Sequence, residues 1–203
     1  MDGQVSSNGL SAPEQPQSRK RTTMTSLPPD LQPYSDDLDK ADQRALDLSA
    51  RLTDKEFFWQ PDEGRRWSVA LCLDHLAVAN TVYGAAIAGA LGQARARGWT
   101  RTGPGIPGFF GRQFANSLEP PAKRRTSAPA TIKPRQVSSR DQVLRDYRAA
   151  HDRIRDLLRD AASLDTNRAR FRNPFIGHVR VKVATGFLII SAHDRRHLWQ
   201  AEQ

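Results

Sequence analysis

Apolar residues recur three and four positions apart in four separate segments of the chain, and this spacing limits the fold more than any other feature. The first segment shows it most clearly, with a stripe at Leu38, Ala41, Ala45, Leu48 and Leu52. Side chains spaced in this way share one face of an α-helix, which is buried against neighbouring helices. The pattern predicts an all-α fold, a four-helix bundle with a long connection between helices 2 and 3.

Signals for the start of a helix mark the other three segments. The second helix is expected to begin after the N-cap Ser68 and to run towards Gly92 or Gly98. The third is expected to start at the capping box of residues 139–142, and the fourth to start near Val179–Val183 and to reach the C-terminus. Valines alternate in that last range, which alone would suggest a strand, but the length and spacing of the residues after it favour a helix.

The segment between the second and third expected helices is basic and rich in glycine and proline. Residues 92–140 contain ten basic residues and one acidic residue, Glu119, so this segment carries the whole formal net charge of +9. Repeated glycine and proline exclude a long regular element there, and a connection of this length is usually functional or partly disordered. We expect some of its cations, among Arg112, the cluster 123–125 and Lys133, to attract an anionic substrate.

The N-terminal 30 residues are rich in Ser, Gln, Pro and Arg and hold few large apolar residues. Such a segment cannot offset the entropy that is lost on ordering. A disordered tail is therefore predicted over residues 1–30, followed by a single domain over residues 31–203. Nothing before Met24 has the pattern of a structural element, so Met24 is an alternative to Met1 as the true start.

The composition excludes several classes of protein. With one cysteine, Cys72, the chain has neither an internal disulfide framework nor a cysteine-rich zinc module. No apolar run approaches the roughly 20 residues needed to cross a bilayer. The N-terminus also lacks the apolar region of a signal peptide. We therefore expect a soluble, cytoplasmic protein without a membrane partner.

Three of the five histidines are expected on the inward faces of two helices. His193 and His197 are four residues apart, so their rings leave the same face of the fourth helix, and two such rings can bind one metal ion. His75 belongs to the buried face of the second helix. Each has an ordinary explanation when taken alone, but a metal ion is the simplest reason for all three. His151 is expected at the surface, and His178 at the start of the fourth helix.

No general base stands out, so the catalytic and substrate-binding residues are left unassigned. Asp74 is adjacent to His75 and is expected to face about 100° away from it. Tyr83 and Asn80 are candidates for a cavity, with core packing or capping as the alternative. Cys72 is interpreted as a small buried hydrophobe rather than a neighbour of the metal. Packing roles are expected for the tryptophans Trp59, Trp67 and Trp199.

Several motifs resemble the DinB-like (DinB/YfiT) family over about residues 34–203. They are Trp67-Ser68, Asp74-His75-Leu76, Asn173-Pro174-Phe175-Ile176-Gly177 and His193-Asp194-Arg195-Arg196-His197-Leu198-Trp199-Gln200. The resemblance implies a four-helix bundle in which His75, His193 and His197 hold a divalent metal ion. The chain departs from the family at Leu71 and Asn173, where many members have an acidic residue and a histidine.

The same resemblance implies a divalent-metal-dependent enzyme, a thiol S-transferase or a hydrolase that acts on a small molecule. It also implies a low-molecular-weight thiol cosubstrate and a homodimer. Zinc or nickel is the expected ion for three imidazole ligands, with iron as the alternative. Two other functions stay open: a metal-binding bundle without catalysis, and a binder of nucleic acid or anions through the basic connection. Nucleic acid is disfavoured because few aromatic residues interleave the cations and no recognition helix is evident.

Overall fold

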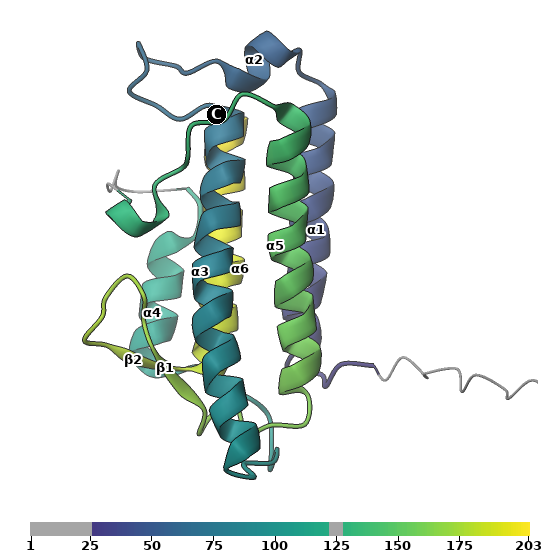
Figure 1. Ribbon diagram of the computed structural model, residues 1–203, viewed down its shortest axis with the longest axis vertical. Helices are drawn as coiled ribbons and strands as arrows, with labels where there is room; N and C mark the ends of the chain where they lie inside the picture. Colours follow the sequence, from purple (N-terminus) through teal and green to yellow (C-terminus); the bar gives the residue numbers. More distant parts are fainter. Residues whose placement is uncertain (1–25, 122–127) are drawn as a thin grey trace, which may run out of the picture.

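Four long helices lie side by side in the computed structural model (Figure 1), which describes residues 26–121 and 128–203. They are α1 (Gln32–Ala50), α3 (Val69–Ala96), α5 (Arg140–Ala161) and α6 (Val183–Glu202). Both α1 and α3 pack against α5 and α6. The predicted all-α fold, with a long connection between the second and third long helices, is confirmed.

Shorter elements fill the connections between the long helices. The turn between α1 and α3 contains α2 (Asp54–Phe58), and the long connection contains α4 (Phe109–Leu118) and the 3₁₀ helix η1 (Ala130–Ile132). An antiparallel hairpin precedes α6 and consists of β1 (Arg170–Arg172) and β2 (Arg180–Lys182). In Figure 1 the hairpin and α4 lie on the same side of the molecule.

Serine caps confirm the predicted starts of two long helices. Ser68 Oγ accepts a hydrogen bond from the backbone N–H of Leu71 at 3.2 Å, and Ser139 Oγ accepts one from the N–H of Gln142 at 3.3 Å. These N–H groups have no acceptor within their own helix, so the serine side chains satisfy them. α3 ends just before Gly98, whose φ of 62° is a left-handed conformation that glycine adopts easily.

The fourth long helix begins at the last residue of the range expected for its start. Residues 180–182 form the strand β2, and α6 begins only at Val183. Val181 lies opposite Phe171 of β1, and the Phe171 ring packs edge-on against Tyr83 of α3. The alternating valines therefore indicate a real strand, which is too short to dominate the helical pattern that follows it.

The basic connection contains a ten-residue helix, α4, that its composition does not predict. The N–H of Gly108 donates to Thr185 Oγ1 of α6 at 2.9 Å, immediately before α4 begins. At Gly111 an added Cβ atom would lie 2.1 Å from Thr185 Cγ2, so only glycine lets α4 approach α6 this closely. Glycines that suggest a loop in the sequence here serve a contact between helices.

α3 supplies much of the hydrophobic core. By length and mean hydropathy this helix could cross a membrane, whereas no such segment was expected from the sequence. However, 67% of its most apolar window is buried inside the molecule. A helix that packs against α5, α6 and the hairpin needs apolar residues on most of its faces, which explains its composition.

Contacts with the body of the molecule begin before residue 31. The Asp30 carboxylate accepts a hydrogen bond from the N–H of Gly105 at 2.6 Å. Residues 1–25 of the expected tail and the basic cluster 123–125 lie outside the described residues. The predicted tail and the predicted role of that cluster stay predictions.

Candidate metal centre

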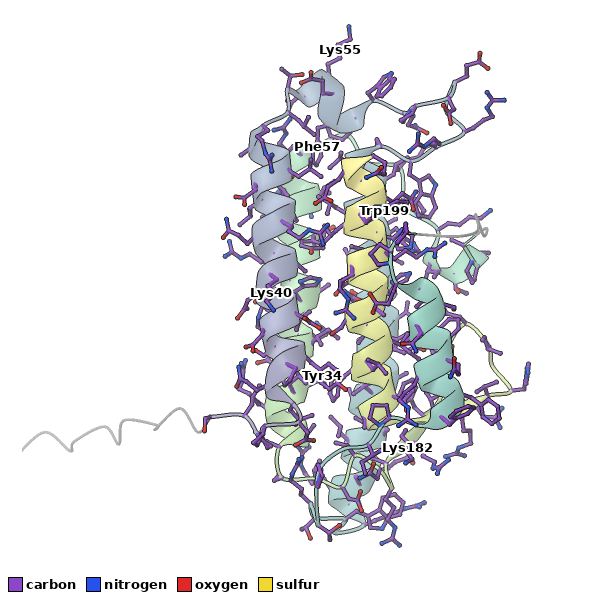
Figure 2. All side chains as sticks on the ribbon, turned by 180° about the vertical axis from the view of Figure 1, so that it is seen from behind. Tyr34, Lys40, Lys55, Phe57, Lys182 and Trp199 are labelled. Carbon is purple, nitrogen blue, oxygen red and sulfur yellow. The ribbon has the colours of Figure 1, made fainter. Side chains whose placement is uncertain are left out.

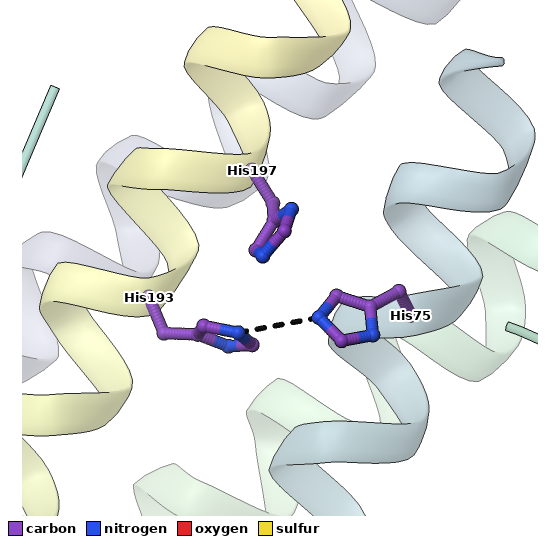
Figure 3. A group of neighbouring side chains, drawn as sticks. All are labelled: His75, His193 and His197. Atoms are coloured by element: carbon purple, nitrogen blue, oxygen red, sulfur yellow. Dashed lines mark hydrogen bonds between the residues drawn. The ribbon is translucent and has the colours of Figure 1, made fainter. Parts of the chain in front are cut away.

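Three histidine rings from two helices meet at one point (Figure 3). His75 comes from α3, and His193 and His197 come from α6. One nitrogen from each ring lies within 4.8 Å of the other two, and the Nε2 atoms of His75 and His193 are 3.2 Å apart. Two nitrogens bound to one ion at about 2.1 Å would be about 3.0 to 3.4 Å apart at bond angles of about 90° to 109°. The spacing of the triad therefore suits a shared metal ion.

Hydrogen bonding leaves ring nitrogens of the triad available as ligands. His75 Nδ1 lies 2.5 Å from the backbone carbonyl oxygen of Ile132 and donates its proton to it. In a neutral ring this leaves the lone pair on Nε2, the atom that faces His193. His197 Nδ1 is buried and has no hydrogen-bond partner among the described residues.

The surroundings of the triad favour neutral imidazoles. Burial lowers the pKa of His193 to about 3, with further contributions from the charges of His75 and Arg196. Burial is also the main reason why the pKa values of His75 and His197 lie below the ordinary histidine value. Neutral imidazole is the form that binds a metal ion, so the triad needs no deprotonation at pH 7.

An indole ring covers the triad on one side. The Trp67 ring centroid lies 4.8 Å from that of His75 and 5.8 Å from that of His197, and it stacks on the latter. The sequence interpretation of Trp67 as a packing residue misses this contact with the site. Trp59 is 63% exposed, so its expected packing role is wrong.

The triad lies in the wall of a cavity of about 1700 Å³ between α3, α6 and the connection. Tyr83 and Asn80 both line the cavity, and each also has a structural partner. The Tyr83 hydroxyl accepts a hydrogen bond from Asn173 Nδ2 at 2.8 Å, and Asn80 Nδ2 donates to Asp194 at 3.0 Å. Cys72 does not line the cavity, and burial raises the pKa of its thiol to about 12. The cysteine is a buried apolar residue, as expected.

The cations around the cavity are mostly not those suggested by the sequence. Lys133 lines it, whereas Arg112 does not and donates instead to the carbonyl of Pro107 at 3.3 Å. No described residue of the lining has a carboxylate side chain. The other lining cations are Arg65, Arg66, Arg135 and Arg196. Of these four arginines, only Arg135 belongs to the basic connection. The connection therefore supplies two of the cavity cations, Lys133 and Arg135, and other segments supply the rest.

An ion pair between the buried Asp74 and the half-exposed Arg135 holds the connection against α3 next to the triad. Asp74 is fully buried, and its carboxylate accepts hydrogen bonds from the backbone N–H of Arg135 at 2.6 Å and from Arg135 Nε at 3.0 Å. Ile132 precedes this arginine by three residues and supplies the carbonyl that accepts from His75. Asp74 therefore fixes the backbone segment whose carbonyl group orients His75. The sequence predicts only that Asp74 faces away from His75 and does not indicate this role.

A fourth buried histidine lies in a different environment. His151 of α5 is fully buried, so its predicted surface position is wrong. Its Nδ1 is 2.7 Å from Asp42 of α1, and its Nε2 is 3.5 Å from Asp194 of α6. Burial alone would lower the pKa of His151, but the charges and hydrogen bonds of Asp194 and Asp42 raise it to about 9. His178 lies exposed in the turn of the hairpin and not at the start of α6.

Comparison with known proteins agrees with this architecture. No curated protein and no solved structure matches the chain significantly. The family model of the DinB superfamily matches residues 37–201, which includes α3, α5, most of α1 and α6, and the whole triad. The chain belongs to the DinB superfamily.

Proposed function

We propose that the chain is a divalent-metal-dependent enzyme that acts on a small molecule, with His75, His193 and His197 as the metal ligands. The observation that carries this proposal is the meeting of three imidazole nitrogens within 4.8 Å of one another in the wall of a large cavity. Among the described residues this is the one group of three or more potential ligands at such distances. A structural metal needs no adjoining cavity, whereas a catalytic one does.

The donor set suits a catalytic ion. Three neutral imidazoles leave a divalent ion its full charge and at least one open coordination position, with zinc or nickel as the proposed ion and iron as the alternative. A bound ion of this kind polarises a carbonyl group or lowers the pKa of a bound water or thiol. The chain itself orients His75 through the Ile132 carbonyl and excludes water on one side of the triad with the Trp67 ring.

The size of the cavity favours transfer between two small molecules over hydrolysis of one. Its volume of about 1700 Å³ exceeds the roughly 300–1000 Å³ of a site for a single small ligand. A low-molecular-weight thiol and an electrophilic substrate could therefore occupy it together. On this basis we place a thiol S-transferase before a hydrolase. A homodimer is proposed from the family resemblance, and light scattering on the purified chain tests it. The cytoplasmic location expected from the sequence also stays a proposal.

Metal content is the first test of the proposal. Untagged protein should contain about one zinc or nickel ion per chain by elemental analysis. The variants His193→Ala and His197→Ala should contain almost none, whereas His178→Ala, which changes an exposed histidine of the hairpin, should match the wild type. Equal metal content in all four proteins would remove the triad from consideration as a metal site.

Turnover separates an enzyme from a bundle that only binds metal. The metal-loaded chain should transfer at least one thiol from a panel of low-molecular-weight thiols to an electrophile, and His193→Ala should lose this activity. A wild type that holds metal but turns over none of the thiol and hydrolase substrates would be a non-catalytic metal-binding protein.

A further inference from the structure

The outer face of the hairpin is formed by cations alone. In the strand register Arg170 lies opposite Lys182, and Arg172 lies opposite Arg180. The pair between them, Phe171 and Val181, points to the other face, where the Phe171 ring is buried against α3. Because opposite residues of an antiparallel pair share a face, all four cations lie together on the outer one.

This arrangement is unfavourable within the chain itself. Like charges directly opposite each other destabilise a pair of strands. None of the four cations forms an ion pair with a carboxylate among the described residues, although Lys182 Nζ donates to the carbonyl of Ile106 at 3.2 Å. Several cations on the long helices differ, since Arg44, Arg155 and Arg195 pair with carboxylates. The hairpin therefore presents four cations that lack an anion in the described chain.

Large apolar side chains are exposed beside these cations. Phe110 is 85% exposed and Phe109 is 61% exposed, at the start of α4, and Ile106 just before them is 53% exposed. The hydrogen bond from Lys182 to Ile106 joins this apolar group to the hairpin, and Figure 2 shows Lys182 next to the lower end of α4. Exposed groups of large apolar residues mark binding surfaces more often than free surface.

We propose that this face binds the surface of an anionic lipid bilayer. The hairpin cations would lie among the lipid headgroups, and Ile106, Phe109 and Phe110 would enter the interfacial region. Charge complementarity requires an anion, and the apolar group distinguishes a bilayer from nucleic acid. Bases offer stacking faces for the phenylalanines but no apolar layer for an isoleucine. The expectation of no membrane partner rested on the lack of a span, and surface binding needs none. This inference is independent of the metal site.

Cosedimentation of the full chain with vesicles tests whether the hairpin cations contribute to binding. Vesicles of phosphatidylcholine with about a quarter phosphatidylglycerol should bind the wild type at about 0.1 M salt, and vesicles of phosphatidylcholine alone should not. The variant R172E/R180E should bind at least about tenfold more weakly. The control K40E/K55E makes the same change in net charge on α1 and α2 (Figure 2) and should bind within about twofold of the wild type. Equal weakening in both variants, or none in the first, overturns the proposal.

A single reversal separates a binding role of the hairpin from a structural one. Arg180→Glu places a carboxylate opposite Arg172, so the thermal midpoint should rise by about 2 °C while vesicle binding falls. Unchanged vesicle binding by this variant would contradict the proposal. F109S/F110S should weaken vesicle binding several-fold and leave any binding to a random-sequence DNA duplex unaltered. If F109S/F110S binds vesicles as strongly as the wild type does, and R172E/R180E loses binding to the DNA duplex, the face would be assigned to nucleic acid instead.

Discussion

Two histidine sites meet at neighbouring residues of α6 but differ in charge: the triad includes His193, and His151 of α5 lies against the next residue, Asp194. The triad of His75, His193 and His197 has no carboxylate within its ligand group, and burial keeps its rings neutral. His151 is fully buried but lies between Asp42 and Asp194, which raise its pKa to about 9. Burial alone does not decide the state of a histidine, because the nearest carboxylates determine whether the ring can hold a proton.

The comparison also separates two roles. A neutral ring with a free lone pair can bind a metal ion, whereas an imidazolium between two carboxylates is a cation that joins elements of the fold. His151 connects α5 to α1 and α6 in this way. Asp194 belongs to the second group although it follows His193 directly in the sequence. Adjacent residues of one helix therefore serve the two groups separately.

The largest expected effect comes from removing the charged histidine. His151→Asn leaves Asp42 and Asp194 buried without their shared cation, which should lower the free energy of unfolding by about 3–5 kcal/mol. Urea unfolding followed by circular dichroism measures this change. Metal content should stay at the wild-type value, and His178→Asn, at an exposed position, should leave stability unaltered. A loss of metal together with stability would mean that the two groups are not separate.

The pH dependence of stability should follow the same division. The pKa of His151 is raised from the usual 6.5 to about 9, so its stabilisation of about 3 kcal/mol is complete below pH 6.5 and is lost as the pH rises through about 9. The triad works in the opposite direction: its pKa values are lowered, so the metal-free chain loses stability as the pH falls below about 6.5. Urea unfolding of metal-free wild type and His151→Asn at a series of pH values from below 6.5 to above 9 measures both effects. If the free energies of unfolding of the two proteins change in parallel as the pH rises through about 9, the assignment of His151 is wrong.

A smaller but specific effect is expected for the neutral group. His193→Ala should reduce zinc affinity at least about a hundredfold, measured by competition with a chromogenic chelator, because one of three ligands is lost. Stability of the metal-free protein should change little, since this ring forms no ion pair. A large loss of stability without metal would show that the triad also holds the fold together.

The smallest predicted effect concerns the support of the triad. Arg135→Gln removes the guanidinium that binds Asp74 and should lower zinc affinity by about tenfold, because the Ile132 carbonyl then orients His75 less firmly. Arg135→Lys should recover part of the affinity. Arg65→Gln changes another cation of the cavity that has no contact with Asp74 and should have wild-type affinity.

The residues of the triad could be predicted because their type and positions carry the signal. The four-residue spacing of His193 and His197 places both rings on one helix face, and His75 falls on an apolar face of α3. Whether His75 lies close to the other two depends on how α3 packs against α6. The spacing within one helix does not show this, and only the resemblance to a known family indicated that the three residues come together. His151 also had a signal, since it follows Tyr147 by four residues and precedes Ile154 by three, within a buried stripe.

Other parts of the site leave little trace in the sequence. The acceptor for His75 is a backbone carbonyl, which every residue has, so nothing distinguishes position 132. The pairing of Asp74 with Arg135 joins positions 61 residues apart and depends on the path of the connection. The same applies to α4, whose close contact with α6 depends on the missing Cβ atom of Gly111 rather than on a pattern of side chains.

The backbone acceptor at position 132 has a consequence for how this protein can diversify. Because a main-chain oxygen orients His75, replacing the side chain at position 132 need not remove the hydrogen bond that holds this imidazole. The neighbouring side chains of Lys133, Gln136 and Val137 line the cavity. The segment can therefore change the residues that meet a substrate while its backbone keeps the imidazole in place. If the proposed function holds, mutations here can alter substrate specificity while the three histidines keep their arrangement.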